Sequence, residues 1–262
     1  MNNNPLGIID SGVGGLSIAS VIAKKLPNES IIYLGDSASC PYGEKTPEQI
    51  YELSKKMVDY LLRKNIKLLL IACNTITVSA IDRLRKDYPQ LPIVGIVPVL
   101  KTASEKTKSG RIGIFSTNAT ADSQYQRDLV NRFARDKEVL SLGSSDLVPM
   151  IEKLDFGNID AVLKRDLEDF QSFRIDTLAL GCSHFPLIRE RIQKLLPKVL
   201  ILDSSGAVTR QVKRILEHNN ILSQDLNPVY NFYTTGERNA LEYFVKRLFD
   251  KGSVGRVSLN EF

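Results

Sequence analysis

The chain of 262 residues has no tryptophan, two histidines and three cysteines. The cysteines are Cys40, Cys73 and Cys182. They are widely spaced and include no Cys-x-x-Cys pair, which argues against a disulfide framework and against a redox pair. Two histidines supply a zinc site poorly. We therefore expect no metal ion, and any chemistry at these cysteines should be that of free thiols.

Long hydrophobic runs are also absent. The longest apolar segments, such as Leu68–Cys73, are far shorter than the roughly 20 residues that a membrane-spanning helix needs. Residues 1–5 show no basic patch leading into an apolar stretch, so no secretion signal is visible. Both observations predict a cytoplasmic protein with no membrane partner.

The charge is only mildly unbalanced, with 35 basic and 30 acidic side chains and a net charge of +5. The basic residues are spread along the expected helices, and no basic run is interleaved with aromatic residues. Nucleic acid is therefore not an expected partner. A mildly positive field would still attract a small dianionic substrate.

Strand and helix patterns alternate through almost the whole chain. This predicts the α/β class, with parallel sheets that carry helices on both faces. A capping box with proline at the first helical position, Thr46-Pro47-Glu48-Gln49, begins one of the expected helices. A strand at 229–233 and a helix at 237–249 could complete either sheet. The other expected strands are 6–10, 31–35, 67–72, 93–97, 111–115, 176–180 and 199–202.

The alternation runs through two similar cycles. Each contains a strand that ends in short polar residues, Asp10-Ser11 in one and Ser116-Thr117 in the other. Each also contains a strand followed by a small residue and a cysteine, in Ala72-Cys73-Asn74-Thr75 and Gly181-Cys182-Ser183-His184. We interpret this as a duplicated architecture of two similar parallel-sheet α/β domains, each of which offers one cysteine.

Both cysteines lie where parallel sheets bind ligands, at the carboxyl end of a strand. A helix N-terminus there stabilises a thiolate. A papain-like enzyme needs a histidine opposite the cysteine, whereas His184 follows Cys182 on the same turn. A phosphatase-type loop needs an arginine at a set spacing that neither Arg83 nor Arg189 matches. Paired acid/base work by two thiols remains, although a single cysteine is more often just buried.

Weaker signals lie near the same strand ends. Gly12-Val13-Gly14 is followed by Ser17 rather than by a third glycine, so it is either a tight turn or, with Ser11, a cradle for a small anion. Pro41-Tyr42-Gly43 is typical of a rigid turn and could close over a ligand. Location at a strand end favours Asp10, Asp36 and His184 among the titratable residues.

Taken together, the motifs resemble those of the glutamate racemases, in the aspartate/glutamate racemase superfamily. The resemblance extends from residue 7 to Gly236. Ser183 and Phe185 stand where that family usually has threonine and tyrosine. The motifs that carry the resemblance are Ile9–Ser17, Leu34–Ala38, Cys40–Gly43, Ala72–Thr75, Gly181–Leu187 and Phe232–Gly236.

The resemblance implies two α/β domains, 1–98 with 207–262 and an inserted 99–206, with the active site in the cleft between them. It implies no cofactor and assigns Cys73 to D-glutamate and Cys182 to L-glutamate as acid/bases. It completes the catalytic set with Asp10, Asp36, Glu152 and His184, of which Glu152 is indicated by the resemblance alone. The implied substrate-binding residues are Asp10, Ser11, Tyr42, Gly43, Asn74, Thr75, Thr117, Thr120, Ser183 and His184.

The resemblance also predicts the biological role. The enzyme would interconvert L- and D-glutamate and supply D-glutamate for bacterial cell-wall peptidoglycan, and we expect a homodimer. Two alternatives remain open. One is an aspartate racemase or another amino-acid racemase of the superfamily. The other is a two-domain clamp that binds small anions without turnover.

Overall fold

The computed structural model describes residues 2–257. Within these residues the chain forms two compact units. One comprises the chain up to Ile96 together with the chain from Ser205 onward, and the other is Val97–Ser204. Among the described residues, no helix has both the length and the apolar character that crossing a membrane requires.

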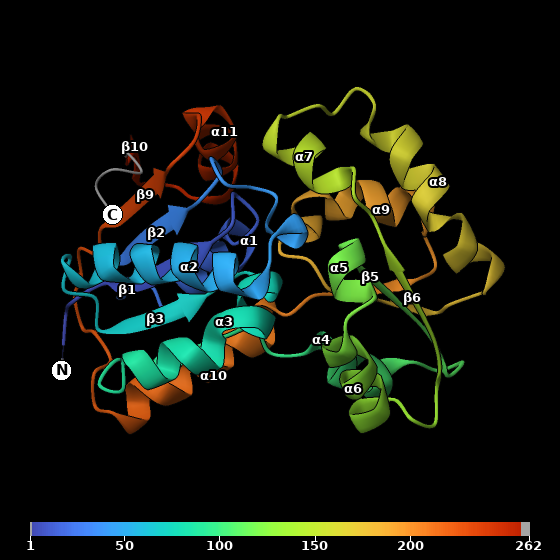
Figure 1. The fold of residues 1–262 in the computed structure, drawn as a ribbon, viewed down its shortest axis with the longest axis horizontal. Helices are drawn as coiled ribbons and strands as arrows, with labels where there is room; N and C mark the ends of the chain where they lie inside the picture. Colours follow the sequence, from blue (N-terminus) through green and yellow to red (C-terminus); the bar gives the residue numbers. More distant parts are fainter. Residues whose placement is uncertain (1, 258–262) are drawn as a thin grey trace. The chain divides into compact units, whose positions relative to one another are not determined.

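The first unit is built on a six-stranded parallel sheet with the strand order β10-β9-β2-β1-β3-β4. Its central strands are entirely buried. In the view of Figure 1, α2 crosses in front of this sheet. The strands are β1 (Leu6–Asp10), β2 (Ile31–Gly35), β3 (Leu68–Ile71), β4 (Ile93–Val94), β9 (Tyr230–Thr234) and β10 (Ser253–Arg256).

Helices cover both faces of this sheet. Helix α1 contacts α10 and α11, and α2 contacts α3. The step from β1 to β2 runs in the opposite direction to the step from β2 to β3, so right-handed crossovers place α1 and α2 on opposite faces. The helices are α1 (Leu16–Lys25), η1, a 3-10 turn (Tyr42–Glu44), α2 (Pro47–Leu62), α3 (Asn74–Asp87), α10 (Ser205–His218) and α11 (Arg238–Leu248).

The second unit has a four-stranded parallel sheet with the order β6-β5-β7-β8. Its strands are β5 (Arg111–Ser116), β6 (Glu138–Gly143), β7 (Thr177–Leu180) and β8 (Leu200–Leu202). Its helices are α4 (Val99–Lys106), α5 (Asn118–Ala121), α6 (Gln124–Phe133), α7 (Leu147–Glu152), α8 (Ile159–Ser172), η2 (Phe185–Ile188) and α9 (Arg189–Leu195). Phe115 packs against Phe170 and Phe185 in its core, with ring centroids 5.8 and 4.6 Å away.

The two sheets repeat one topology. In chain order, the first four strands of the first unit are arranged second-first-third-fourth, and so are the four strands of the second unit. In both, a cysteine is the second residue after the end of the third strand, Cys73 after β3 and Cys182 after β7. The predicted class, two similar parallel-sheet α/β units, is confirmed.

Local patterns account for several boundaries. Thr46 Oγ1 accepts the Gln49 amide at 3.3 Å and Gln49 Oε1 accepts the Thr46 amide at 2.9 Å, so the predicted capping box starts α2. Strand β4 ends at Val94 rather than at the predicted Val97. A Cβ on Gly95 would lie 2.5 Å from Ile81 Cδ1, because the chain leaves the ladder there to pack closely on α3.

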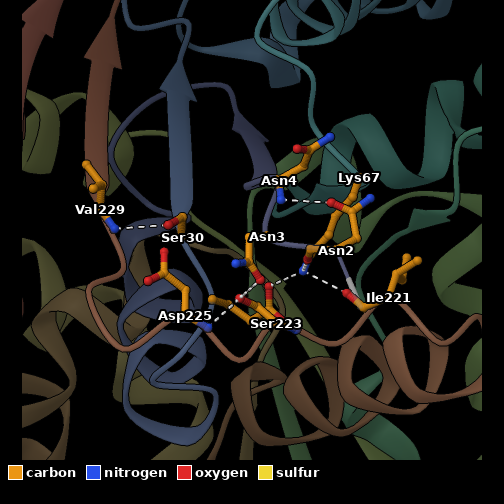
Figure 2. A network of polar contacts seen from close by, with 10 residues as sticks. Asn2, Asn3, Asn4, Ser30, Lys67, Ile221, Ser223, Asp225 and Val229 are labelled. Atoms are coloured by element: carbon orange, nitrogen blue, oxygen red, sulfur yellow. Dashed lines mark hydrogen bonds and ion pairs between the residues drawn. The ribbon is translucent and has the colours of Figure 1, made fainter.

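At the amino-terminal end of the first sheet, a buried ion pair gathers separate parts of the chain. Lys67 Nζ lies 2.7 Å from Glu29 Oε2, and both side chains are 1% exposed. Figure 2 shows Lys67 reaching the backbone oxygens of Asn2 and Ile221, at 2.5 and 2.8 Å. Glu29 Oε1 accepts the Ser223 amide at 2.8 Å. The pair therefore fastens the N-terminal segment and the connection between α10 and β9 to the sheet.

Replacing Lys67 should lower the free energy of unfolding, because Lys67 is the cation of this buried ion pair. In Lys67→Met the Glu29 carboxylate would stay buried without its cation, and we expect the free energy of unfolding to fall by about 3–5 kcal/mol in urea titrations. Lys55→Met is the matched control, because its ion pair with Asp59 is 39% exposed on both sides, and there we expect a loss of about 0–1 kcal/mol. Equal losses in the two variants would contradict this account.

Candidate active site

The strand register brings the predicted residues of the first unit to one edge of the sheet. Asp10 pairs with Gly35 across β1 and β2, and Ile9 pairs with Ile71 across β1 and β3. The next residues continue the ladder, since the Asp36 amide donates to the Asp10 carbonyl at 2.9 Å. Asp10, Asp36 and Cys73 therefore leave the sheet side by side at its carboxyl end, where parallel sheets bind ligands.

Cys73 lies at the end of a short polar chain. Its Sγ is 3.5 Å from Ser11 Oγ, and Ser11 Oγ donates to Asp10 Oδ1 at 3.2 Å. The thiol is 4% exposed and occupies the N-cap of α3, which begins with the half-buried Asn74 and Thr75. The free amides and partial positive charge of this helix end favour the thiolate.

The Gly12–Gly15 segment is a tight strand-to-helix turn. The Gly12 amide donates to Asp10 Oδ1 at 3.0 Å, so this N–H is engaged by the protein itself. A Cβ on Gly15 would lie 2.7 Å from Ala72 Cβ and 2.9 Å from Asp10 Oδ2. The glycine thus lets the turn approach the end of β3, and these contacts support the turn interpretation of the motif.

Tyr42 and Asp36 form a second contact in this unit. The Tyr42 hydroxyl donates to Asp36 Oδ2 at 2.7 Å. Burial, and then the charge of Asp36, raise the pKa of Tyr42 well above its usual value, so the hydroxyl keeps its proton. Gly43 follows in the η1 turn. Thr235, which the sequence did not indicate as a site residue, donates to the other oxygen of Asp36.

In the second unit, Cys182 contacts a histidine that is backed by a carboxylate. Its Sγ lies 4.0 Å from His184 Nδ1, and His184 Nε2 lies 2.6 Å from Glu152 Oε1. The turn after β7 brings these two side chains together, although His184 is only two residues from Cys182 in the sequence. Cysteine, histidine and glutamate are all residue types that bind metal ions. Here, however, each ring nitrogen of His184 already faces a protein group.

His184 is buried and contacts both Cys182 and Glu152. Burial by itself lowers the pKa of His184, but the contacts with Cys182 and Glu152 outweigh it and hold the pKa well above its usual range. The raised pKa favours the protonated ring. His184 thus places a ring nitrogen against the Cys182 sulfur, with Glu152 behind it.

The remaining predicted residues of this unit lie at the carboxyl ends of its strands. Phe115 pairs with Leu180 across β5 and β7, which brings Thr117 and Cys182 to the same edge of the sheet. Thr117 caps α5, and its Oγ1 donates to Thr120 Oγ1 at 3.1 Å. Ser183, which follows Cys182 in the sequence, is buried. Each unit thus presents one thiol among hydroxyl and carboxylate groups.

Comparison with known proteins identifies the class of the chain. The model of the Asp/Glu/Hydantoin racemase family matches residues 15–212, and the chain belongs to this family. It is therefore an isomerase of the racemase class. The curated glutamate racemase of Stutzerimonas stutzeri is 38% identical over 95% of this chain and 96% of its own length.

Solved structures of glutamate racemases share the fold. The isoform RacE1 of Bacillus anthracis has a TM-score of 0.87 and 33% identity, and the match covers 99% of both chains. The enzyme of Francisella tularensis, solved in complex with D-glutamate, has a TM-score of 0.84 and 30% identity, with 100% of both chains covered.

The charge on His184 can be measured directly, because the chain has only one other histidine, His218. In proton NMR titrations we expect the pKa of His184 to lie above the usual value in the wild type and to fall in Glu152→Gln, which removes the charge that holds the proton. Because the pKa of His184 is raised in the folded state, its protonation stabilises the fold. This stabilisation is fully present at pH values below the usual histidine pKa and is lost as the pH rises through the raised pKa of the folded state.

The control for this titration is Glu168→Gln, which removes an exposed carboxylate from the same unit. It should leave the pKa of His184 unchanged. The assignment of the charge would be wrong if Glu152→Gln left that pKa where it was.

Proposed function

We propose that this chain is a cofactor-independent glutamate racemase, in which Cys73 and Cys182 exchange protons with the α-carbon of glutamate from opposite faces. The proposal depends on the repeated position of two thiols. Each follows the third strand, in chain order, of a sheet with the same topology, and each contacts a polar side chain. Curated relatives at 36–40% identity, all glutamate racemases, support glutamate as the substrate.

Racemisation itself requires two groups. One base takes the α-proton from one face, and the resulting carbanion accepts a proton from an acid on the other face. In our proposal one thiolate forms the new S–H bond while the opposite thiol gives up its proton to carbon, so the two cysteines exchange protonation states in each turnover. No oxidation or external proton acceptor is needed.

On the side of Cys73, we propose that Ser11 and Asp10 assist. While the Ser11 hydroxyl donates to Asp10, its oxygen can accept the Cys73 S–H, and when the sulfur is a thiolate the hydroxyl can turn to donate to it instead. The start of α3 adds partial positive charge when the sulfur is a thiolate. By resemblance, this side takes the α-proton of D-glutamate.

On the side of Cys182, we propose that His184 and Glu152 assist. The imidazolium lies against the sulfur and is held by the carboxylate behind it, so it favours the thiolate that begins the reaction of L-glutamate. A buried cation also helps to stabilise negative charge that develops on the substrate. The order Cys–His–Glu sets both the position and the charge of the ring.

We further propose that residues 1–98 with 207–262 and residues 99–206 are two domains that close over the substrate. Closure would exclude water, which strengthens every electrostatic contact with the carbanion. The amides and hydroxyls of the strand ends would hold the ammonium and carboxylates of glutamate. These groups belong to Ser11, Tyr42, Gly43, Asn74, Thr75, Thr117, Thr120 and Ser183.

The cellular role follows from the product. D-glutamate made by this reaction would serve cell-wall peptidoglycan, and thereby cell shape, in a bacterial cytoplasm. We propose that the working form is a homodimer with glutamate as its small-molecule partner, and with neither nucleic acid nor a membrane among its partners.

Removing either thiol should stop the reaction. We expect Cys73→Ala and Cys182→Ala each to lower kcat for interconversion of L- and D-glutamate by at least about 10²–10⁴-fold, since each loses one acid/base group. Circular dichroism of the substrate follows the reaction, with no cofactor added. Cys40→Ala removes the third cysteine and should keep most of the activity. Full turnover in either of the first two variants would refute the two-thiol scheme.

Substrate and class are tested by two further measurements. With L-aspartate in place of L-glutamate, we expect little racemisation, and faster turnover of aspartate would point to another racemase of the superfamily.

In D₂O, we expect deuterium at the α-carbon of the product, because the returning proton comes from a thiol that exchanges with solvent. A binding clamp would bind glutamate and leave its α-carbon unlabelled.

A further inference from the structure

The Asp36 carboxylate is held by two hydroxyl groups from distant parts of the chain. Tyr42 Oη donates to Oδ2 at 2.7 Å and Thr235 Oγ1 donates to Oδ1 at 2.5 Å. Asp36 itself is 1% exposed. A buried carboxylate that accepts a hydroxyl bond at each oxygen is fixed in position, because losing either donor leaves a charged acceptor unsatisfied.

Thr235 is placed for this contact by the sheet. It follows β9, whose last residue, Thr234, pairs with Gly35 of β2, and its own amide donates to the Gly35 carbonyl at 3.1 Å. Its Oγ1 also accepts the Ala38 amide at 3.0 Å. The hydroxyl thus has a defined donor and a defined acceptor, and the β-branched side chain restricts its rotamer.

The contact has a consequence for Tyr42 and Cys73. Tyr42 is buried, and its ring belongs to the same apolar cluster as Cys73 and Ile76. The hydroxyl end of the ring is anchored by Asp36, and η1 contacts α3, whose N-cap is Cys73. The direction of that carboxylate therefore affects where the ring and the η1 turn lie relative to the thiol.

We infer that Thr235 is a positioning residue of the proposed active site, which acts through Asp36 to hold Tyr42 and the η1 turn beside Cys73. In this role Asp36 is a buried anchor, in place of the direct part in proton transfer that the family resemblance implies for it. The inference rests on the proposed racemase function. It assigns Thr235 no contact with the reacting atoms.

The kinetic test uses isosteric and conservative variants. In Thr235→Val, which keeps the shape and loses the hydroxyl, we expect KM for glutamate to rise about tenfold, with a smaller change in kcat, since a hydrogen bond to a charged group is lost. Thr235→Ser keeps the hydroxyl and should restore KM to within about twofold of the wild type. The matched control is Thr209→Val, which removes a buried hydroxyl bonded within α10 and should leave both constants unchanged.

A double variant tests whether Thr235 acts through Asp36. Tyr42→Phe removes the other donor to the same carboxylate. If the two donors work as a unit, Thr235→Val combined with Tyr42→Phe should raise KM by less than the product of the two single effects. Multiplicative effects, an unchanged KM in Thr235→Val, or a failure of Thr235→Ser to restore KM would each overturn the inference.

A second measurement needs no substrate. Amide hydrogen exchange of residues 36–44 should be faster in Thr235→Val than in the wild type, and unchanged in Thr209→Val, because the anchor of this segment is lost. Unchanged exchange in Thr235→Val would overturn the inference even in an active racemase. If instead the wild type failed to racemise glutamate, the proposed function would fall, while the exchange data would still decide whether Thr235 holds this segment.

Discussion

The parallel pairing of β1 with its two neighbours is the constraint from which the first half of the candidate site follows. Because β1 lies between β2 and β3 and all three run in the same direction, their last residues reach one edge of the sheet together. The polar groups of the candidate site follow within two residues of the strand ends and include Ser11, Asp36 and Cys73. They are placed by backbone ladder bonds rather than by long loops, which gives them little freedom to drift. The second sheet repeats this arrangement around Cys182.

Although the two sheets share one topology, the groups that surround the two thiols differ. Cys73 caps a helix of 14 residues, so amides and the helix dipole are available to a thiolate. Cys182 precedes a 3-10 turn of four residues, too short to provide much of a dipole, and in our proposal the protonated ring of His184 supplies the positive charge instead. The two sheets therefore place the sulfur at equivalent positions, while the groups around it differ. A two-thiol scheme accommodates this difference, because it asks only that each sulfur be stable both with and without its proton.

Short-range patterns in the sequence predicted the α/β class, the capping box at Thr46 and the strand-end locations of Asp10, Cys73 and Cys182, because each depends on neighbours within a turn or a strand. Contacts that depend on tertiary pairing were not predictable in this way. Nothing near Thr235 indicates that it meets Asp36, and Glu152 was indicated only by family resemblance. The choice of sheet for the strand near 229–233 was open for the same reason and was settled by its pairing with β2. Strand β6 was missed because it is half-exposed along most of its length and carries no strong alternation.

The return of the chain to its first sheet affects the order in which the protein can fold during synthesis. Strand β2 obtains its outer neighbour, Tyr230–Thr234, only after Val97–Ser204 has been made. As the chain leaves the ribosome, the second unit is a contiguous stretch that can complete its own core, whereas β2 remains an unpaired edge, open to pairing with other chains. A nascent chain interrupted before residue 230 would therefore carry one finished unit and one aggregation-prone sheet.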